Sequence, residues 1–189
     1  GALAIAVGGL CGWALIPELP GRIAVIVVSA FVLALLGVAF AGREPPRGAR
    51  RGALTAAAVA AVAGGVRLEW SGLAALDVAG TVAVIVVGAI ALRWFAVSDG
   101  LAPAMTAASL AGVFALGAFG DQGARATLAV ATGGACLGFL GYNFPPASVY
   151  VNRDGALFLG FLVAALAIDA QPAIGRPGSL AVPLLLLAV

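Results

Sequence analysis

The stretch 138–160 reads GFLGYNFPPASVYVNRDGALFLG, and it places a short polar segment inside an otherwise apolar chain. One apolar run ends at Leu140, and the next begins directly after Asp154. Between the two runs, Pro145 and Pro146 end any helix, because proline has no backbone N–H and also restricts the residue before it. The pattern predicts two helices that are joined by a polar loop.

The composition indicates a membrane protein. Of the 189 residues, 63% are hydrophobic and only 10% are charged, and the mean hydropathy is +1.15. A water-soluble globule of this size could not cover its surface with so few polar residues. All ten basic residues are arginines and the net charge is only +2, so nothing indicates a nucleic-acid partner.

Apolar runs alternate with short interruptions that are rich in proline, glycine or charge, which predicts an all-α, polytopic transmembrane bundle. We expect one integral membrane domain over residues 1–189, and we expect it to be part of a longer fold. The last run is too short for a crossing, which needs roughly 20 residues. The eight expected segments are 1–16, 23–41, 52–66, 78–95, 101–119, 125–141, 155–170 and 179–189.

The arginines predict the orientation of the chain in the membrane. The loop 42–52 carries four of them, and the loops on the same side add Arg93 and Arg153, which leaves four on the other side. Cytoplasmic loops carry the excess of basic residues, so we expect these loops to be cytoplasmic. Arg47 and Arg50 either signal topology only, which we favour, or also attract anionic lipid head groups or a nucleotide diphosphate.

The sequence of 138–160 resembles a signature of the polyprenyl-phosphate sugar-1-phosphate transferases, which form glycosyltransferase family 4. The usual pattern of this signature is GFLxfNxxPAxxfmGDxGSlfLG. This membrane family contains the phospho-MurNAc-pentapeptide and GlcNAc-1-phosphate transferases. The family's Gly-Asp pair is replaced by Asn152 and Arg153, and its serine by Ala156, while an acidic residue follows as Asp154. The residues in register are Gly138, Phe139, Leu140, Asn143, Pro146, Ala147, Gly155, Leu157, Phe158, Leu159 and Gly160.

A second family pattern, llGllDD, is kept only in its apolar part. Leu36 and Gly37 fit the lead-in, whereas Phe40 and Ala41 stand where the resemblance places two carboxylates. The acceptor phosphate would therefore lose a proposed base or orienting group.

A third family pattern, NAxNxxDGxDGLaxGxs, resembles residues 91–109, ALRWFAVSDGLAPAMTAAS. Asp99 and Gly100 align with its first Asp-Gly pair. Arg93 and Ala96 replace its two asparagines, and Ala-Pro replaces its second Asp-Gly. A single Asp at the end of a membrane helix is otherwise more often an interfacial cap.

The resemblance implies transfer of a sugar 1-phosphate from a UDP-sugar to a polyprenyl phosphate in cell-envelope glycan synthesis. It implies Mg²⁺ held by carboxylates, a bacterial inner membrane location with cytoplasmic site loops, and partnership in a homodimer or an envelope-synthesis complex. The candidate catalytic and metal-binding residues are Asp99 and Asp154. The candidate substrate-binding residues are Asn143, Arg153, Asn152, Gly100, Arg47 and Arg50.

Two other functions compete with this one. A catalytically degenerate member of the family would bind lipid phosphate or act as an assembly subunit, and a small transporter would relay protons through Asp99 and Asp154. Arg153 allows two interpretations of the site. In the first, its positive charge repels Mg²⁺ and itself binds a phosphate. In the second, a shift of one residue brings Asp154 into the position of the metal ligand. The sequence favours neither of these two interpretations over the other.

Overall fold

The computed structural model describes residues 1–14, 20–40, 46–69, 71–119 and 123–170, except for the side chains of Arg47 and of residues 117–119. Over these ranges the chain forms seven helices and no strand, which confirms the predicted all-α class. The expected eighth segment, 179–189, lies outside the described residues. The helices are α1 (Ala2–Ala14), α2 (Gly21–Ala39), α3 (Arg47–Ala63), α4 (Ala74–Phe95), α5 (Leu101–Phe119), α6 (Gly123–Asn143) and α7 (Arg153–Asp169).

Three of the seven helices, α2, α4 and α6, are long and apolar enough to cross a membrane by length and composition. Shorter apolar helical stretches occur in α1 and α5. Large side chains such as Val28, Val32 and Leu137 are exposed on α2 and α6, as expected where a helix faces lipid instead of water. The bundle is thus that of a helical membrane protein.

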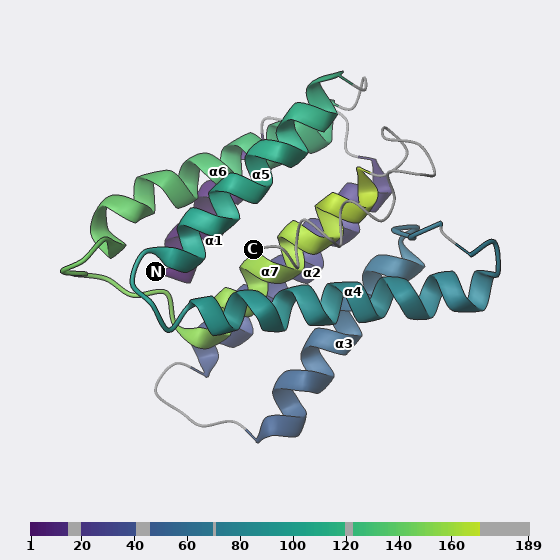
Figure 1. Cartoon of the computed structure of the whole chain (residues 1–189), viewed down its shortest axis with the longest axis horizontal. Helices are drawn as coiled ribbons and strands as arrows, with labels where there is room; N and C mark the ends of the chain where they lie inside the picture. Colours follow the sequence, from purple (N-terminus) through teal and green to yellow (C-terminus); the bar gives the residue numbers. More distant parts are fainter. Residues whose placement is uncertain (15–19, 41–45, 70, 120–122, 171–189) are drawn as a thin grey trace.

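Helix α7 lies at the centre of the bundle. Every residue from Gly155 to Asp169 is buried, and Phe161, Leu159 and Leu166 are among the largest completely buried side chains. The helix packs mainly against α4 and α2, and also touches α1, α3 and α5 (Figure 1). A helix that is apolar on all sides belongs inside a bundle. The second half of the stretch 138–160 therefore forms the core helix.

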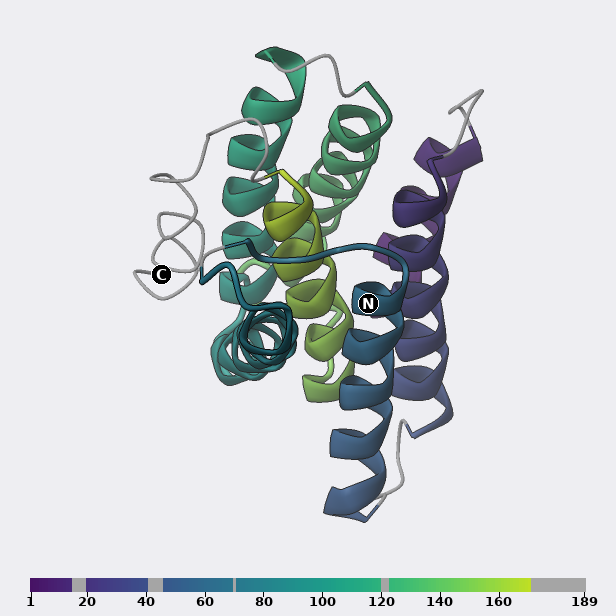
Figure 2. The same ribbon diagram turned by 90° about the vertical axis from the view of Figure 1, so that its right-hand side faces the viewer.

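Helix α4 crosses α7 at a steep angle. In Figure 1 α4 runs horizontally across the bundle, and in Figure 2 it is seen end-on while α7 is seen from the side. At the crossing, a Cβ on Gly160 would lie 2.6 Å from Ala89 Cα and 3.0 Å from the Gly88 carbonyl oxygen. Small residues allow membrane helices to approach this closely. The last glycine of the 138–160 signature is needed for this contact.

The C-terminal end of α7 is fixed by a buried ion pair. The Arg125 Nε and Nη2 atoms, at the start of α6, donate to Asp169 Oδ2 at 2.9 Å and 2.7 Å. Both side chains are buried, and a buried charge needs a partner because its desolvation is costly. The pair fixes the far end of α7, away from the loop 144–152 that precedes the helix.

We predict that Gly160→Ala lowers the free energy of unfolding by about 1–3 kcal/mol, because the added methyl group would overlap the backbone of α4. Gly138→Ala is the matched control, since no atom of a neighbouring element lies within 4 Å of a Cβ built at Gly138. Denaturation of the purified variants in detergent micelles measures both changes. Equal stability of the two variants would contradict the close contact.

Candidate functional site

Asn152 joins the loop to two helices. Its Oδ1 accepts a hydrogen bond from the Gly155 N–H at 2.9 Å, which caps the start of α7. Its Nδ2 donates to the Gly37 carbonyl oxygen, at the end of α2, at 3.0 Å. The last turn of α2 and the first turn of α7 are consequently in close contact, since a Cβ on Gly37 would lie 3.2 Å from the Asp154 carbonyl carbon.

Asn143 joins the other two segments that the sequence singled out. Its Oδ1 accepts from the Gly100 N–H at 3.0 Å, and its Nδ2 donates to the Val149 carbonyl oxygen at 2.9 Å. Gly100 has a φ of +77°, in the left-handed region that favours glycine. The buried Asn143 amide therefore positions the start of α5 and the loop 144–152 relative to the end of α6.

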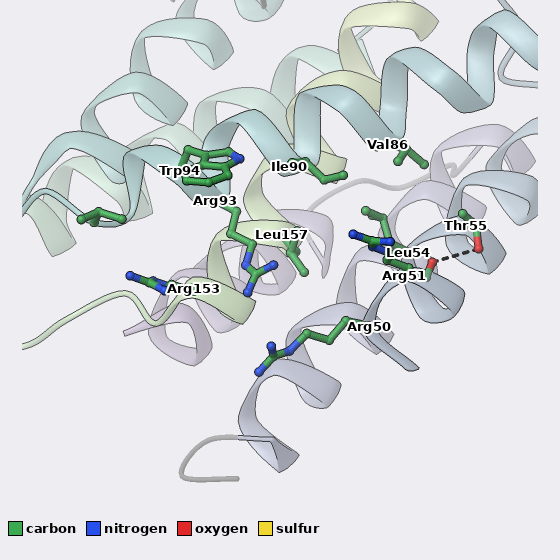
Figure 3. A pocket seen from close by; sticks show the side chains of 11 residues that line it. Arg50, Arg51, Leu54, Thr55, Val86, Ile90, Arg93, Trp94, Arg153 and Leu157 are labelled. Carbon is green, nitrogen blue, oxygen red and sulfur yellow. Dashed lines mark hydrogen bonds between the residues drawn. The ribbon is translucent and has the colours of Figure 1, made fainter. Parts of the chain in front are cut away.

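A groove of about 380 Å³ opens beside this junction, between α3, α4 and the start of α7. Four arginines line it, and they come from three different helices (Figure 3). Arg50 and Arg51 belong to α3, Arg93 to α4 and Arg153 to α7. The remaining lining residues are Leu54, Thr55, Val86, Ile90, Trp94, Val97 and Leu157.

The charge in the groove is strongly positive. Arg50 Nε lies 3.0 Å from Asp154 Oδ1, which forms an ion pair at the edge of the groove, although the two atoms lack the geometry of a hydrogen bond. Among the described lining residues there is no carboxylate to neutralise the other three arginines. The Nε of Arg93 is buried and has no hydrogen-bond partner. Guanidinium groups donate paired, charge-assisted hydrogen bonds to phosphate oxygens, so this groove suits a phosphate group.

The two predicted carboxylates are used differently. Asp154 belongs to the ion pair with Arg50, whereas Asp99 is exposed in the turn between α4 and α5 and is not part of the groove lining. The described residues contain no group of three His, Cys, Asp or Glu side chains that could hold a metal ion. Mg²⁺ requires oxygen ligands, but here a guanidinium contacts an oxygen of Asp154. Mg²⁺ is usually held by one or two carboxylates with water and substrate phosphates, whereas the described residues beside this groove offer only the second oxygen of Asp154, next to a guanidinium. They are a poor fit to a Mg²⁺ site.

The remaining predicted site residues also fall into two groups, those that line the groove and those that do not. Arg50 and Arg153 line the groove, whereas Gly100, Asn143 and Asn152 bind other parts of the protein. The side chain of Arg47 lies outside the described part of the structure.

Sequence reasoning did not single out Arg51, Arg93 or Trp94 as site residues. For Arg93 a signal was available, because it replaces the first asparagine of the third family pattern. Nothing in the sequence shows that Arg51 and Trp94 face the same groove, since this depends on how α3 and α4 pack.

Comparison with known proteins supports the resemblance. The family model for glycosyl transferase family 4 matches residues 20–171 of the chain. The chain is also similar to proteins named phospho-N-acetylmuramoyl-pentapeptide-transferase. It is 46% identical over 72 residues to that of Moorella thermoacetica, and 39% identical over 70 residues to that of Heliobacterium modesticaldum. Each match covers 37% of this chain and 22% of the relative.

A shorter match, to the Clostridioides difficile protein of the same name, is 51% identical over 43 residues, which are 23% of this chain and 13% of the relative. In these comparisons the chain spans less than a quarter of the length of each relative.

We predict that Asn143→Ala lowers the free energy of unfolding by about 1–3 kcal/mol, because it leaves the buried N–H of Gly100 and the carbonyl of Val149 without partners. Ser148→Ala is a matched control in the same loop, where the lost hydrogen bond to the Tyr142 carbonyl is exposed. Denaturation in micelles compares the two. If both variants lose the same small amount, Asn143 does not hold this junction together.

Proposed function

Since the chain belongs to glycosyltransferase family 4, we propose that it binds a polyprenyl phosphate, with the phosphate held by the arginine groove. The observation that carries this proposal is the convergence of four arginines from α3, α4 and α7 on a single groove (Figure 3). We place the groove on the cytoplasmic side of a bacterial inner membrane, because its arginines come from the start of α3, the end of α4 and the start of α7, the parts of the chain that carry the excess of basic residues.

The apolar part of the groove suits a lipid. Leu54 on α3, Val86 and Ile90 on α4, and Leu157 on α7 supply an apolar wall beside the arginines. Each CH₂ group of a lipid tail that leaves water contributes about 0.8 kcal/mol to binding. Trp94 lines the groove and is 74% exposed, which suits the interface between membrane and water. A ligand with a phosphate head and an apolar tail matches both halves of the lining.

The second candidate function is transfer of a sugar 1-phosphate from a UDP-sugar to that lipid. The similarity to proteins named as transferases favours it. With Asp99 and Asp154 as Mg²⁺ ligands, a Mg²⁺ ion would have to bind Asp154 beside the Arg50 guanidinium or displace it. The ion pair therefore favours a member of the family that binds lipid phosphate without catalysing transfer.

We predict that Arg93→Gln weakens binding of undecaprenyl phosphate by about tenfold or more, the cost of losing a charge-assisted hydrogen bond. Equilibrium titration of the purified chain in lipid nanodiscs measures this affinity. Arg67→Gln is the matched control, because it removes the same charge from an exposed site beyond the far end of α3. Equal affinity of both variants and the unmodified chain would rule out the groove as the binding site.

Transfer is tested by exchange of labelled UMP into UDP-GlcNAc, with the purified chain, undecaprenyl phosphate and Mg²⁺. We expect exchange at the level of protein-free membranes, because Asp154 is held by Arg50, the second family pattern lacks both of its carboxylates, and the third lacks one of two. Exchange that is clearly above this level and is lost in Asp154→Asn would favour the transferase.

A further inference from the structure

The ion pair between Arg50 and Asp154 joins α3 to the first turn of α7 at the edge of the groove. The two side chains are only 21% and 11% exposed. Ion pairs that are open to water contribute little, because water screens the charges, whereas a mostly buried charge depends on its partner. The pair is therefore more than a surface contact.

The backbone of Asp154 is held in place beside the groove. Its backbone carbonyl group is 3.2–3.3 Å from the position of a Cβ on Gly37, so the end of α2 packs directly against it. The cap by Asn152 fixes the same turn. An acidic residue in the first turn of a helix is also stabilised by the helix dipole. The carboxylate is thus attached to a fixed turn at the groove edge, where its charge would repel a phosphate unless a cation neutralised it.

Two kinds of cation could neutralise this carboxylate: a divalent metal ion or a side chain of the protein. The described residues hold no group of three acidic, histidine or cysteine side chains for a metal. Arg50 is in contact with Asp154, and Arg153 is its neighbour in the sequence. The positive charge of Arg50, 3.0 Å from the carboxylate, disfavours a divalent cation there. Arg50 already contacts the carboxylate directly.

We propose that Arg50 acts as a built-in counter-ion of Asp154, so that the groove binds its lipid phosphate without a divalent metal ion. This inference rests on the proposed function and specifies the chemistry of the same groove. Arg50 neutralises the only carboxylate at the groove edge among the described residues, which leaves Arg51, Arg93 and Arg153 to bind the phosphate oxygens.

The first test titrates the unmodified chain in nanodiscs with undecaprenyl phosphate, once in EDTA and once in Mg²⁺. We expect dissociation constants that agree within about twofold, far less than the tenfold change that one charge-assisted hydrogen bond would cause. Binding in Mg²⁺ alone would overturn the built-in counter-ion and leave the proposed function standing. An absence of binding under both conditions would overturn the proposed function itself.

The second test separates neutralisation from direct binding by Arg50. Arg50→Gln leaves the Asp154 carboxylate without its partner, so binding in EDTA should weaken by about tenfold or more. The double variant Arg50→Gln/Asp154→Asn removes both charges and should recover most of that loss. A double variant as weak as Arg50→Gln would show that Arg50 binds the phosphate directly, and would overturn the inference.

Arg51→Gln is the matched control, because Arg51 is the next residue of α3, lines the same groove and forms no ion pair with Asp154. Its loss of affinity should not be rescued by Asp154→Asn to the level of the unmodified chain. Equal rescue of Arg50→Gln and Arg51→Gln would mean that Asp154 repels the ligand despite Arg50, which contradicts neutralisation.

Discussion

The burial of α7 on every side is the constraint on which the rest of the structure depends. A helix with no face left for lipid must be covered by neighbours all round, and α2 and α4 provide most of this cover. The close approach at Gly160 fixes where α4 crosses, and the contact at Gly37 fixes the end of α2. Because both contacts involve backbone atoms, the first turn of α7 has little freedom to move. The positions of Arg153 and Asp154 in this turn are therefore fixed by the packing of α7.

The junction of the three family patterns is held by amides and glycines and not by acids. Asn143 and Asn152 each form hydrogen bonds to backbone groups with both the oxygen and the nitrogen of the side-chain amide. Gly100 supplies the left-handed turn between α4 and α5. None of these interactions needs a carboxylate. The geometry of the site can therefore persist where the sequence has Phe40 instead of an aspartate, which explains how a long signature coexists with altered chemistry.

The sequence predicted the helices well and the groove only in part. The predicted segment 78–95 corresponds to Ala74–Phe95, because the continuous apolar run between Asp77 and Arg93 forms the body of the helix. The pairing of Arg50 with Asp154 could not be predicted, since it depends on which face of α3 meets α7. Arg93 stood out only as a topology signal and as the replacement of an asparagine. Local patterns indicate where helices begin and end, whereas the groove arises from their packing.

Helix α3 links the stability of the site to its charge. It carries Arg50 and Arg51, so one helix supplies both the partner of Asp154 and a groove arginine. A movement of α3 away from α7 would widen the groove and also expose the Asp154 carboxylate to the ligand. Attraction across the ion pair opposes this movement, and it is strengthened because both side chains are mostly withdrawn from water. The same contact that neutralises the site thus keeps its walls together.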